Sequence, residues 1–134
     1  MSRDRFFDTN ILVYAHTTGD SRSELARTLL VSGGTVGVQA LNEFTSVARA
    51  KLKFTWQQIH SAIENILILC PNPQPLSVDL HLRARTLSER YGFSIWDGLM
   101  VAAAIEARCG TLFTEDLQHG QIIDGLRIEN PFLQ

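Results

Sequence analysis

Long hydrophobic runs, paired cysteines and an excess of basic charge are all missing from this 134-residue chain. Its longest apolar stretch, residues 98–105, is far shorter than the roughly 20 residues that a membrane-spanning helix needs, so no membrane partner is expected. Cys70 and Cys109 stand too far apart for a zinc site or a disulfide-rich scaffold. We expect two buried thiols in a reducing compartment, and acids at positions 4 and 8 interrupt any signal-peptide core. These features predict a cytoplasmic protein.

The small net charge of −2 favours no class of partner by itself. It is not the basic balance of a protein that coats nucleic acid. A nucleic-acid enzyme with an acidic site is still compatible with it, because the acids of the site offset basic residues elsewhere. With 45% hydrophobic and 19% charged residues, the composition is that of a folded globular protein. We expect one domain over residues 1–134, long enough to bury a single core.

Short apolar runs alternate with helix-like patterns along the chain. The expected strands end at Asp8, cover residues 35–38 and 111–114, and finish with residues 126–128. The expected helices cover residues 11–16, 23–30, 39–51, 55–69, 77–91 and 94–105. This alternation predicts an α/β fold, a three-layer α/β/α sandwich around a four- to five-stranded, mainly parallel sheet.

Capping residues and apolar stripes give these helices their expected ends and faces. Thr55 opens a capping-box sequence, and Gly92 and Gly110 are expected helix stops. The other expected caps are Asp20 or Ser21 for the second helix and Ser77 or Asp79 for the fifth. The second helix is expected to bury Leu25, Ala26, Leu29 and Leu30.

Four acidic residues stand where this fold would gather its strand ends and helix starts. Asp8 and Asp116 follow expected strands, and Asp97 lies in the first turn of a helix whose residues 99–105 are all apolar. Glu43 lies among apolar rather than charged positions of its helix. Three of these acids have a plain structural alternative, as a helix cap for Asp8, a dipole partner for Glu43, and a capping-box member with Ser94 for Asp97.

The carboxyl ends of parallel strands share one edge of a sheet, so these four carboxylates are expected in one crevice. They would repel one another and resist ionisation unless the crevice held a hard divalent cation. Mg²⁺ or Mn²⁺ prefers oxygen ligands, and near a phosphodiester it activates water and offsets charge. The histidines, His16, His60, His81 and His119, have unrelated spacings, which argues against zinc. We interpret His119 as an exposed loop residue rather than a substrate contact.

The chain resembles the PIN-domain ribonucleases, and most of all the VapC toxins of type II toxin–antitoxin pairs. Four segments carry the resemblance, Phe-Asp-Thr-Asn-Ile-Leu at 7–12, Asn-Glu-Phe at 42–44, Trp-Asp at 96–97 and Leu-Phe-Thr-Glu-Asp-Leu at 112–117. They occur in the family's order and span nearly the whole chain.

This resemblance implies a metal-dependent endoribonuclease that uses Mg²⁺ or Mn²⁺ to hydrolyse RNA. The implied catalytic and metal-binding quartet is Asp8, Glu43, Asp97 and Asp116. Residues that would support the quartet are Thr9, Asn10 and Thr114, whereas the substrate-binding residues stay unknown. The family pattern further implies a homodimer and a small antitoxin whose C-terminal segment enters the acidic groove.

Several alternatives stay open. Glu115 adjoins Asp116, and because neighbours on an extended chain point opposite ways, we expect Asp116 to face the metal. A nuclease that matures RNA without an antitoxin, or a non-catalytic PIN-like binding module, would share the fold. A phosphatase of the haloacid dehalogenase type would need an acid two residues after Asp8, where Asn10 stands. Candidate contacts for RNA phosphates, equally explained as solvated helix faces, are Arg49, Lys51, Lys53, Arg83 and Arg85.

Overall fold

Four short strands form one sheet at the centre of the fold. The structure is a computed structural model that describes residues 4–133. The strands are β1 (Arg5–Phe7), β2 (Thr111–Phe113), β3 (Ile122–Ile123) and β4 (Leu126–Glu129), in the order β1-β2-β4-β3. β1, β2 and β4 run parallel and β3 is antiparallel to β4. The expected α/β fold with a mainly parallel sheet is confirmed.

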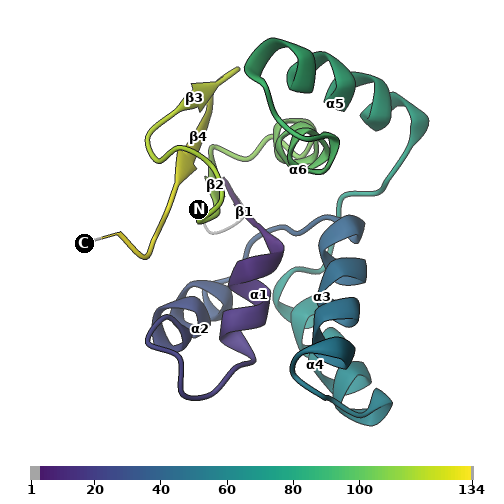
Figure 1. Ribbon diagram of the computed structural model, residues 1–134, viewed down its shortest axis with the longest axis vertical. Coiled ribbons are helices and arrows are strands. Elements are labelled where there is room, and N and C mark those ends of the chain that lie inside the picture. The colour runs from purple at the N-terminus through teal and green to yellow at the C-terminus, as the bar shows by residue number, and fades with distance from the viewer. Residues whose placement is uncertain (1–3, 134) are drawn as a thin grey trace.

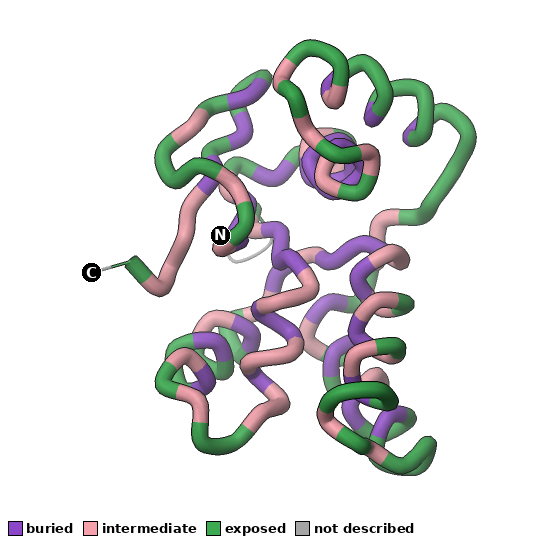
Figure 2. The backbone as a smooth tube through the Cα atoms, viewed as in Figure 1, coloured by how far each residue is buried: buried purple, intermediate pink, exposed green. Residues whose placement is uncertain are grey.

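Within residues 4–133, six helices cover the two faces of this sheet (Figure 1). The lower half of the view holds α1 (Thr9–Ala15), α2 (Ser23–Val31), α3 (Val38–Ala50) and α4 (Trp56–Leu69), and the upper half holds α5 (Val78–Tyr91) and α6 (Ile95–Glu106). Adjacent strand residues enter opposite cores, because side chains alternate along a strand. Phe6 and Leu112 pack with α5 and α6, whereas Phe7 and Phe113 pack with α1–α4. The buried residues of the helices accordingly lie on the sides that face the interior of the fold (Figure 2).

Local signals set several helix boundaries as predicted. Thr55 caps α4 in a complete capping box, in which its side chain accepts a hydrogen bond from Gln58 N–H at 3.1 Å and its N–H donates to Gln58 Oε1 at 2.8 Å. Ser77 caps α5 through Leu80 N–H. Gly92 ends α5 in the left-handed region with φ of 76°, where glycine carries no steric cost.

The second helix and the expected strand at 35–38 differ from the prediction. Thr35 and Gly37 make only isolated bridges, with Phe6 and Gln74, before α3 begins at Val38, so the segment does not become a strand. Neither Asp20 nor Ser21 caps α2; its N-cap is Arg22, which makes no side-chain capping bond. The Asp20 carboxylate is occupied by the Arg22 guanidinium at 2.8 Å. Leu25 is 41% exposed, so the buried stripe of α2 is narrower than expected.

The C-terminal third also departs from prediction in two places. α6 ends at Glu106, ahead of Gly110, because the chain turns at Arg108, which has φ of 60°. β3 was not predicted and forms with β4 a hairpin that turns at Asp124 and Gly125, both with positive φ. No helix between residues 4 and 133 is long and apolar enough to cross a membrane.

Gly98 allows α6 to lie directly against α5. A β-carbon placed at this residue would stand 2.7 Å from the backbone oxygen of Ala84 on α5. Any larger residue would therefore push the two helices apart. Since Gly98 follows Asp97 in the first turn of α6, this close packing also positions the backbone that carries Asp97.

Candidate active site

Asp8 lies where β1 passes into α1, and its side chain is held on several sides. It is the N-cap of α1, and its Oδ1 accepts a hydrogen bond from Thr9 N–H at 2.6 Å. Its other oxygen, Oδ2, accepts from Thr114 Oγ1 at 2.7 Å and from Asn10 Nδ2 at 3.1 Å. The residue is only 8% exposed. Asp8 is thus both a helix cap and a buried carboxylate.

This environment raises the pKa of Asp8 to about 7 from its ordinary value of 3.8. Burial is the largest cause, because the charged form loses its hydration. The negative charges of Asp116 and Glu43 raise the pKa further, whereas the hydrogen bonds from Thr114 and Thr9 lower it. The site therefore disfavours the charged form of Asp8 unless a positive charge is supplied.

Glu43 approaches the same place from α3. It lies beside the buried row of that helix, which includes Ala40 and Phe44, and it is itself half-buried. Its Oε1 accepts a hydrogen bond from Thr9 Oγ1 at 2.7 Å. Thr9 thus contacts two acids at once, through its backbone N–H to Asp8 and its hydroxyl to Glu43.

Asp97 enters from the first turn of α6. The Ser94 hydroxyl caps this helix by accepting a hydrogen bond from Asp97 N–H at 3.1 Å. Partial burial is the main cause that raises the pKa of the Asp97 carboxyl, and the charges of Asp116 and Glu43 raise it further, against a hydrogen bond with Ser94 that lowers it. The negative charges of Asp116 and Glu43 therefore act on the Asp97 carboxyl, although Asp97 belongs to the opposite layer of the fold.

Asp116 and Glu115 follow β2 and point to different surroundings. Asp116 N–H donates to Thr114 Oγ1 at 3.1 Å, and Asp116 Oδ2 accepts from Asn10 Nδ2 at 3.3 Å. Glu115 instead accepts a hydrogen bond from the Tyr14 hydroxyl and pairs with Arg22 at 3.2 Å. The Arg22 guanidinium also lies 3.9 Å from the centre of the Tyr14 ring. Asp116 is therefore the member of the pair beside Asp8.

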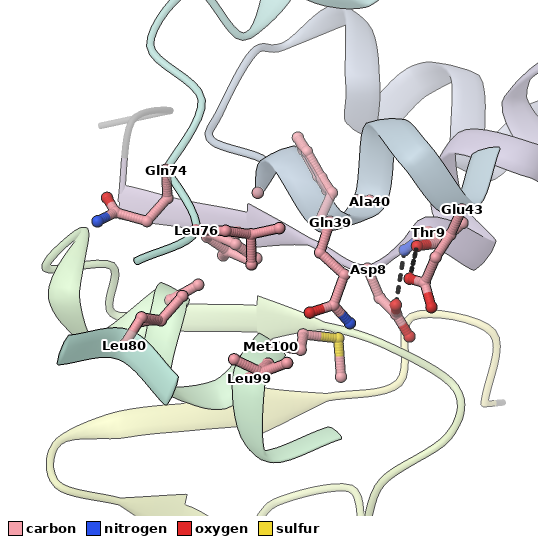
Figure 3. Close-up of a pocket in the computed structure, with 14 residues that line it drawn as sticks. Asp8, Thr9, Gln39, Ala40, Glu43, Gln74, Leu76, Leu80, Leu99 and Met100 are labelled. Atoms are coloured by element: carbon pink, nitrogen blue, oxygen red, sulfur yellow. Dashed lines mark hydrogen bonds between the residues drawn. The ribbon is translucent and has the colours of Figure 1, made fainter. Parts of the chain in front are cut away.

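The four predicted acids line one cavity of about 400 Å³. Asp8, Glu43, Asp97 and Asp116 reach it from four separate segments, and the predicted supporting residues Thr9 and Asn10 line it as well. Thr114 lies behind Asp8, fully buried. A narrow apolar pocket of about 20 Å³ adjoins the cavity (Figure 3). In that view Asp8, Thr9 and Glu43 lie together at one end, and Leu76, Leu80 and Leu99 lie away from them.

The acids suit a hydrated cation better than a closed metal cage. Within residues 4–133, no three His, Cys, Asp or Glu side chains are drawn together into a ready-made metal cluster. Mg²⁺ keeps several of its waters and often takes only one or two carboxylates, so an open set of oxygens is enough. Asn10 Oδ1 is buried beside Asp8 without a hydrogen-bond partner in the described chain, which leaves one more oxygen unsatisfied. This donor set fits Mg²⁺ or Mn²⁺.

The cavity also contains residues that the sequence interpretation did not place there, namely Gln39, Trp96 and Tyr14. The position of Trp96 directly before Asp97 was the one available signal. Of the basic candidates, Lys51 lines the cavity, whereas Arg49 donates to Phe54 O at 3.0 Å and stacks on Trp56. His119 lies in an exposed loop, where its Nδ1 accepts from Asn130 N–H at 3.0 Å.

Comparison with solved structures finds the same fold in bacterial toxin proteins. A toxin–antitoxin complex from Klebsiella pneumoniae matches with a TM-score of 0.72 and 20% identity, over 96% of this chain and 98% of that one. VapBC2 of Rickettsia felis, bound to a DNA fragment from its promoter, matches with a TM-score of 0.63 and 25% identity, over 94% and 97% of the two chains. VapC20 of Mycobacterium tuberculosis, a toxin that cleaves the sarcin-ricin loop, matches with a TM-score of 0.63 and 19% identity, over 84% and 91%.

The sequence comparisons give the family itself. No curated protein matches the chain. The family model of the PIN domain matches residues 5–123, which contain all four acids of the cavity. This chain therefore belongs to the PIN domain family.

Proposed function

We propose that this protein is a Mg²⁺- or Mn²⁺-dependent endoribonuclease with Asp8, Glu43, Asp97 and Asp116 as its catalytic, metal-binding acids. The observation that carries the proposal is the meeting of these acids, from β1, α3, α6 and the end of β2, in one cavity. Burial raises the pKa of Asp8 most, and the negative charges of Asp116 and Glu43 raise it further, because like charges repel. PIN nucleases generally use divalent metal ions, in keeping with this chemistry.

The residues around the acids hold them in place for this chemistry. Thr114 links Asp8 to the backbone of Asp116, Asn10 bridges the two carboxylates, and Thr9 links Asp8 to Glu43. Such contacts keep ligand oxygens oriented before anything binds, which lowers the cost of binding. When bound, the ion supplies a means of activating water and of offsetting the charge of the phosphodiester. The side chains supply orientation and the partly dry surroundings that strengthen that charge effect.

We further propose that the protein is the toxin of a toxin–antitoxin pair, acting on RNA in the cytoplasm as a homodimer of single-domain chains. The support is the fold shared with a toxin–antitoxin complex, with VapBC2 and with the toxin VapC20. The expected partner is a small antitoxin. A nuclease that matures RNA without an antitoxin keeps the same site, and a non-catalytic module would keep the fold without turnover.

Cleavage of a labelled single-stranded RNA tests the site. The purified protein should cleave it with Mg²⁺ or Mn²⁺ and not with EDTA. Asp8→Asn and Asp97→Asn should each abolish cleavage and, in cells, growth inhibition, while the circular dichroism spectrum stays native. Asp79→Asn is the matched control, because Asp79 occupies the first turn of α5 as Asp97 does that of α6, but is exposed and outside the cavity.

Undiminished cleavage by both Asp8→Asn and Asp97→Asn would show that the acids have been assigned wrongly. Thermal stabilisation by millimolar Mn²⁺ without any cleavage would favour the binding module. A short open reading frame beside the gene would support an antitoxin, and its absence would favour RNA maturation.

A further inference from the structure

Trp96 is a large aromatic residue placed at the cavity with no aromatic or cationic partner in the described chain. It is 62% exposed, lines the cavity, and directly precedes Asp97 in the first turn of α6. Its ring makes no contact with another ring or with a guanidinium within residues 4–133. Tryptophan is on average a well-buried residue, and this one is exposed directly beside the acids, where a ligand of the cavity could contact its ring.

The other tryptophan of the chain shows what an internally satisfied ring looks like here. Trp56 is 54% exposed, at the start of α4, and the Arg49 guanidinium lies 4.9 Å from its ring centre. That cation–π contact accounts for the position of Trp56. Trp56 does not line the acidic cavity. The two residues are thus similarly exposed, but Trp96 alone lies beside the acids.

The position of Trp96 is fixed by a bond across the cavity. Gln39 of α3 donates a hydrogen bond from Nε2 to the Trp96 carbonyl oxygen at 3.2 Å. Figure 3 shows Gln39 extending from α3 toward Met100 of α6. The start of α6 is held both by this bond and by the close packing of Gly98 on α5, so the backbone that carries the indole is fixed beside the cavity. A fixed point of attachment lowers the entropic cost of presenting the ring to a planar partner.

Lys51 contributes the only basic side chain among the described residues that line this cavity. It stands at the C-terminal end of α3 and is exposed. A cation at the rim would attract a phosphate that the carboxylates repel. The cavity therefore combines acids, one exposed indole and one ammonium group.

We propose that Trp96 stacks an unpaired base of single-stranded nucleic acid next to the phosphate at the acids, and that Lys51 contacts a neighbouring phosphate. This inference rests on the proposed nuclease function and adds the side chains that hold a base and a phosphate beside the acids. Bases stack on exposed aromatic side chains with little dependence on sequence. A duplex keeps its bases inside the helix and cannot offer one to the indole. Trp96 thereby selects unpaired regions as the place of cleavage.

Steady-state cleavage of a short single-stranded RNA tests the role of the ring. Trp96→Ala should raise KM about tenfold or more and change kcat little, because the lost stacking acts on binding. Trp96→Phe should keep most of the affinity, and Trp56→Phe should behave as the unsubstituted protein. Lys51→Ala should raise KM and make KM less steeply dependent on salt concentration, by the amount expected for about one lost phosphate contact. Lys53→Ala should change neither quantity.

An unchanged KM in Trp96→Ala, with cleavage intact in the unsubstituted protein, would overturn the proposal. The proposal would also be overturned if Trp96→Ala kept its KM but no longer self-associated, as measured by light scattering. The indole would then contact a second protein chain rather than a base. Equal KM values for single-stranded and duplex RNA would overturn it as well.

A binding measurement separates this inference from the nuclease proposal. In the double variant Trp56→Phe, Asp8→Asn, Trp96 is the sole tryptophan and cleavage is blocked. With Mg²⁺ present, the single-stranded RNA should quench its fluorescence to saturation, and a duplex of the same sequence should not. Quenching in a protein whose unsubstituted form never cleaves would support the stacking site while refuting the nuclease. Cleavage without quenching would do the reverse.

Discussion

Two aspartates near helix starts face the same cavity from opposite layers, and their surroundings differ. On the strand-end side, formed by Asp8, Thr9, Asn10 and Thr114, the Asp8 carboxylate is buried and accepts three hydrogen bonds. On the helix-start side, formed by Ser94, Trp96 and Asp97, the carboxylate is half-buried beside an exposed indole. The same residue type at a helix start thus serves as a fixed, buried group in one place and an open, solvated one in the other.

Under the proposed function, this difference gives the two sides separate tasks. Burial is the largest cause of the raised pKa at both aspartates, but only Asp8 is enclosed enough to reach about 7. The strand-end side is where a charge costs most and where a cation would relieve most. The helix-start side leaves room for a large substrate to enter. We expect substitutions on the strand-end side to have the larger effects.

The largest expected effect is on stability, in Asp8→Asn without divalent metal. Because the folded pKa of about 7 lies above the ordinary 3.8, the folded state prefers the protonated acid. Stability from this group is intact below about pH 4, declines as pH rises, and is fully lost above about pH 7. Asparagine cannot ionise. The free energy of unfolding of the variant should therefore rise, relative to that of the unsubstituted protein, by at most about 4 kcal/mol between about pH 4 and pH 7.

Urea unfolding in EDTA, followed by circular dichroism at about pH 4, 6 and 8, measures this gain. Asp79→Asn is again the control, and its free energy of unfolding should change with pH in parallel with that of the unsubstituted protein. If the free energy of unfolding of Asp8→Asn also changed in parallel with that of the unsubstituted protein, Asp8 would ionise in the folded state without an energetic penalty. The contrast between a buried Asp8 and an open Asp97 would then disappear.

The strand-end side was also the easier side to predict from sequence. A buried strand that stops at an acid places that acid at the sheet edge, and parallel strands bring Asp116 to the same edge. These inferences need only alternation and strand direction. The caps Thr55, Ser77 and Ser94 were likewise found because a cap depends on residues within one turn.

What depends on contacts between distant segments could not be predicted. Asp20 fails as a cap because Arg22, which also reaches Glu115, occupies its carboxylate. Trp96 and Gln39 enter the cavity because α6 packs on α5 at Gly98 and turns one particular side toward α3. A helix that is apolar at every position from residue 99 to 105 carries no sequence pattern that shows which side that is.

The second prediction concerns Thr114→Val, which removes a hydroxyl and keeps the shape of the side chain. Valine can neither donate to Asp8 Oδ2 nor accept from Asp116 N–H, so both acids lose one fixed contact. Cleavage should fall about 10- to 100-fold, as is usual when a residue that orients metal ligands is lost. Single-turnover rates measured at several Mg²⁺ concentrations should show the loss chiefly as a lower apparent affinity for Mg²⁺, so that more Mg²⁺ is needed to reach the half-maximal rate.

Thr45→Val is a fitting control for that experiment, since Thr45 is a half-buried threonine that bonds only to its own helix, through Leu41 O at 2.9 Å. Equal rates for Thr114→Val and the unsubstituted protein would mean that burial alone keeps Asp8 and Asp116 in place.

The smallest effect is expected on the helix-start side, in Ser94→Ala. The loss of this cap should lower the free energy of unfolding by about 1 kcal/mol, as should Ser77→Ala, because both serines accept a bond from the N–H three residues on at 3.1 Å. Cleavage by Ser94→Ala should fall only a few-fold, since Gln39 and Gly98 still hold the start of α6. Urea unfolding and the same single-turnover assay measure both quantities. A loss of cleavage in Ser94→Ala as large as in Thr114→Val would show that the open side must be fixed as firmly as the buried one.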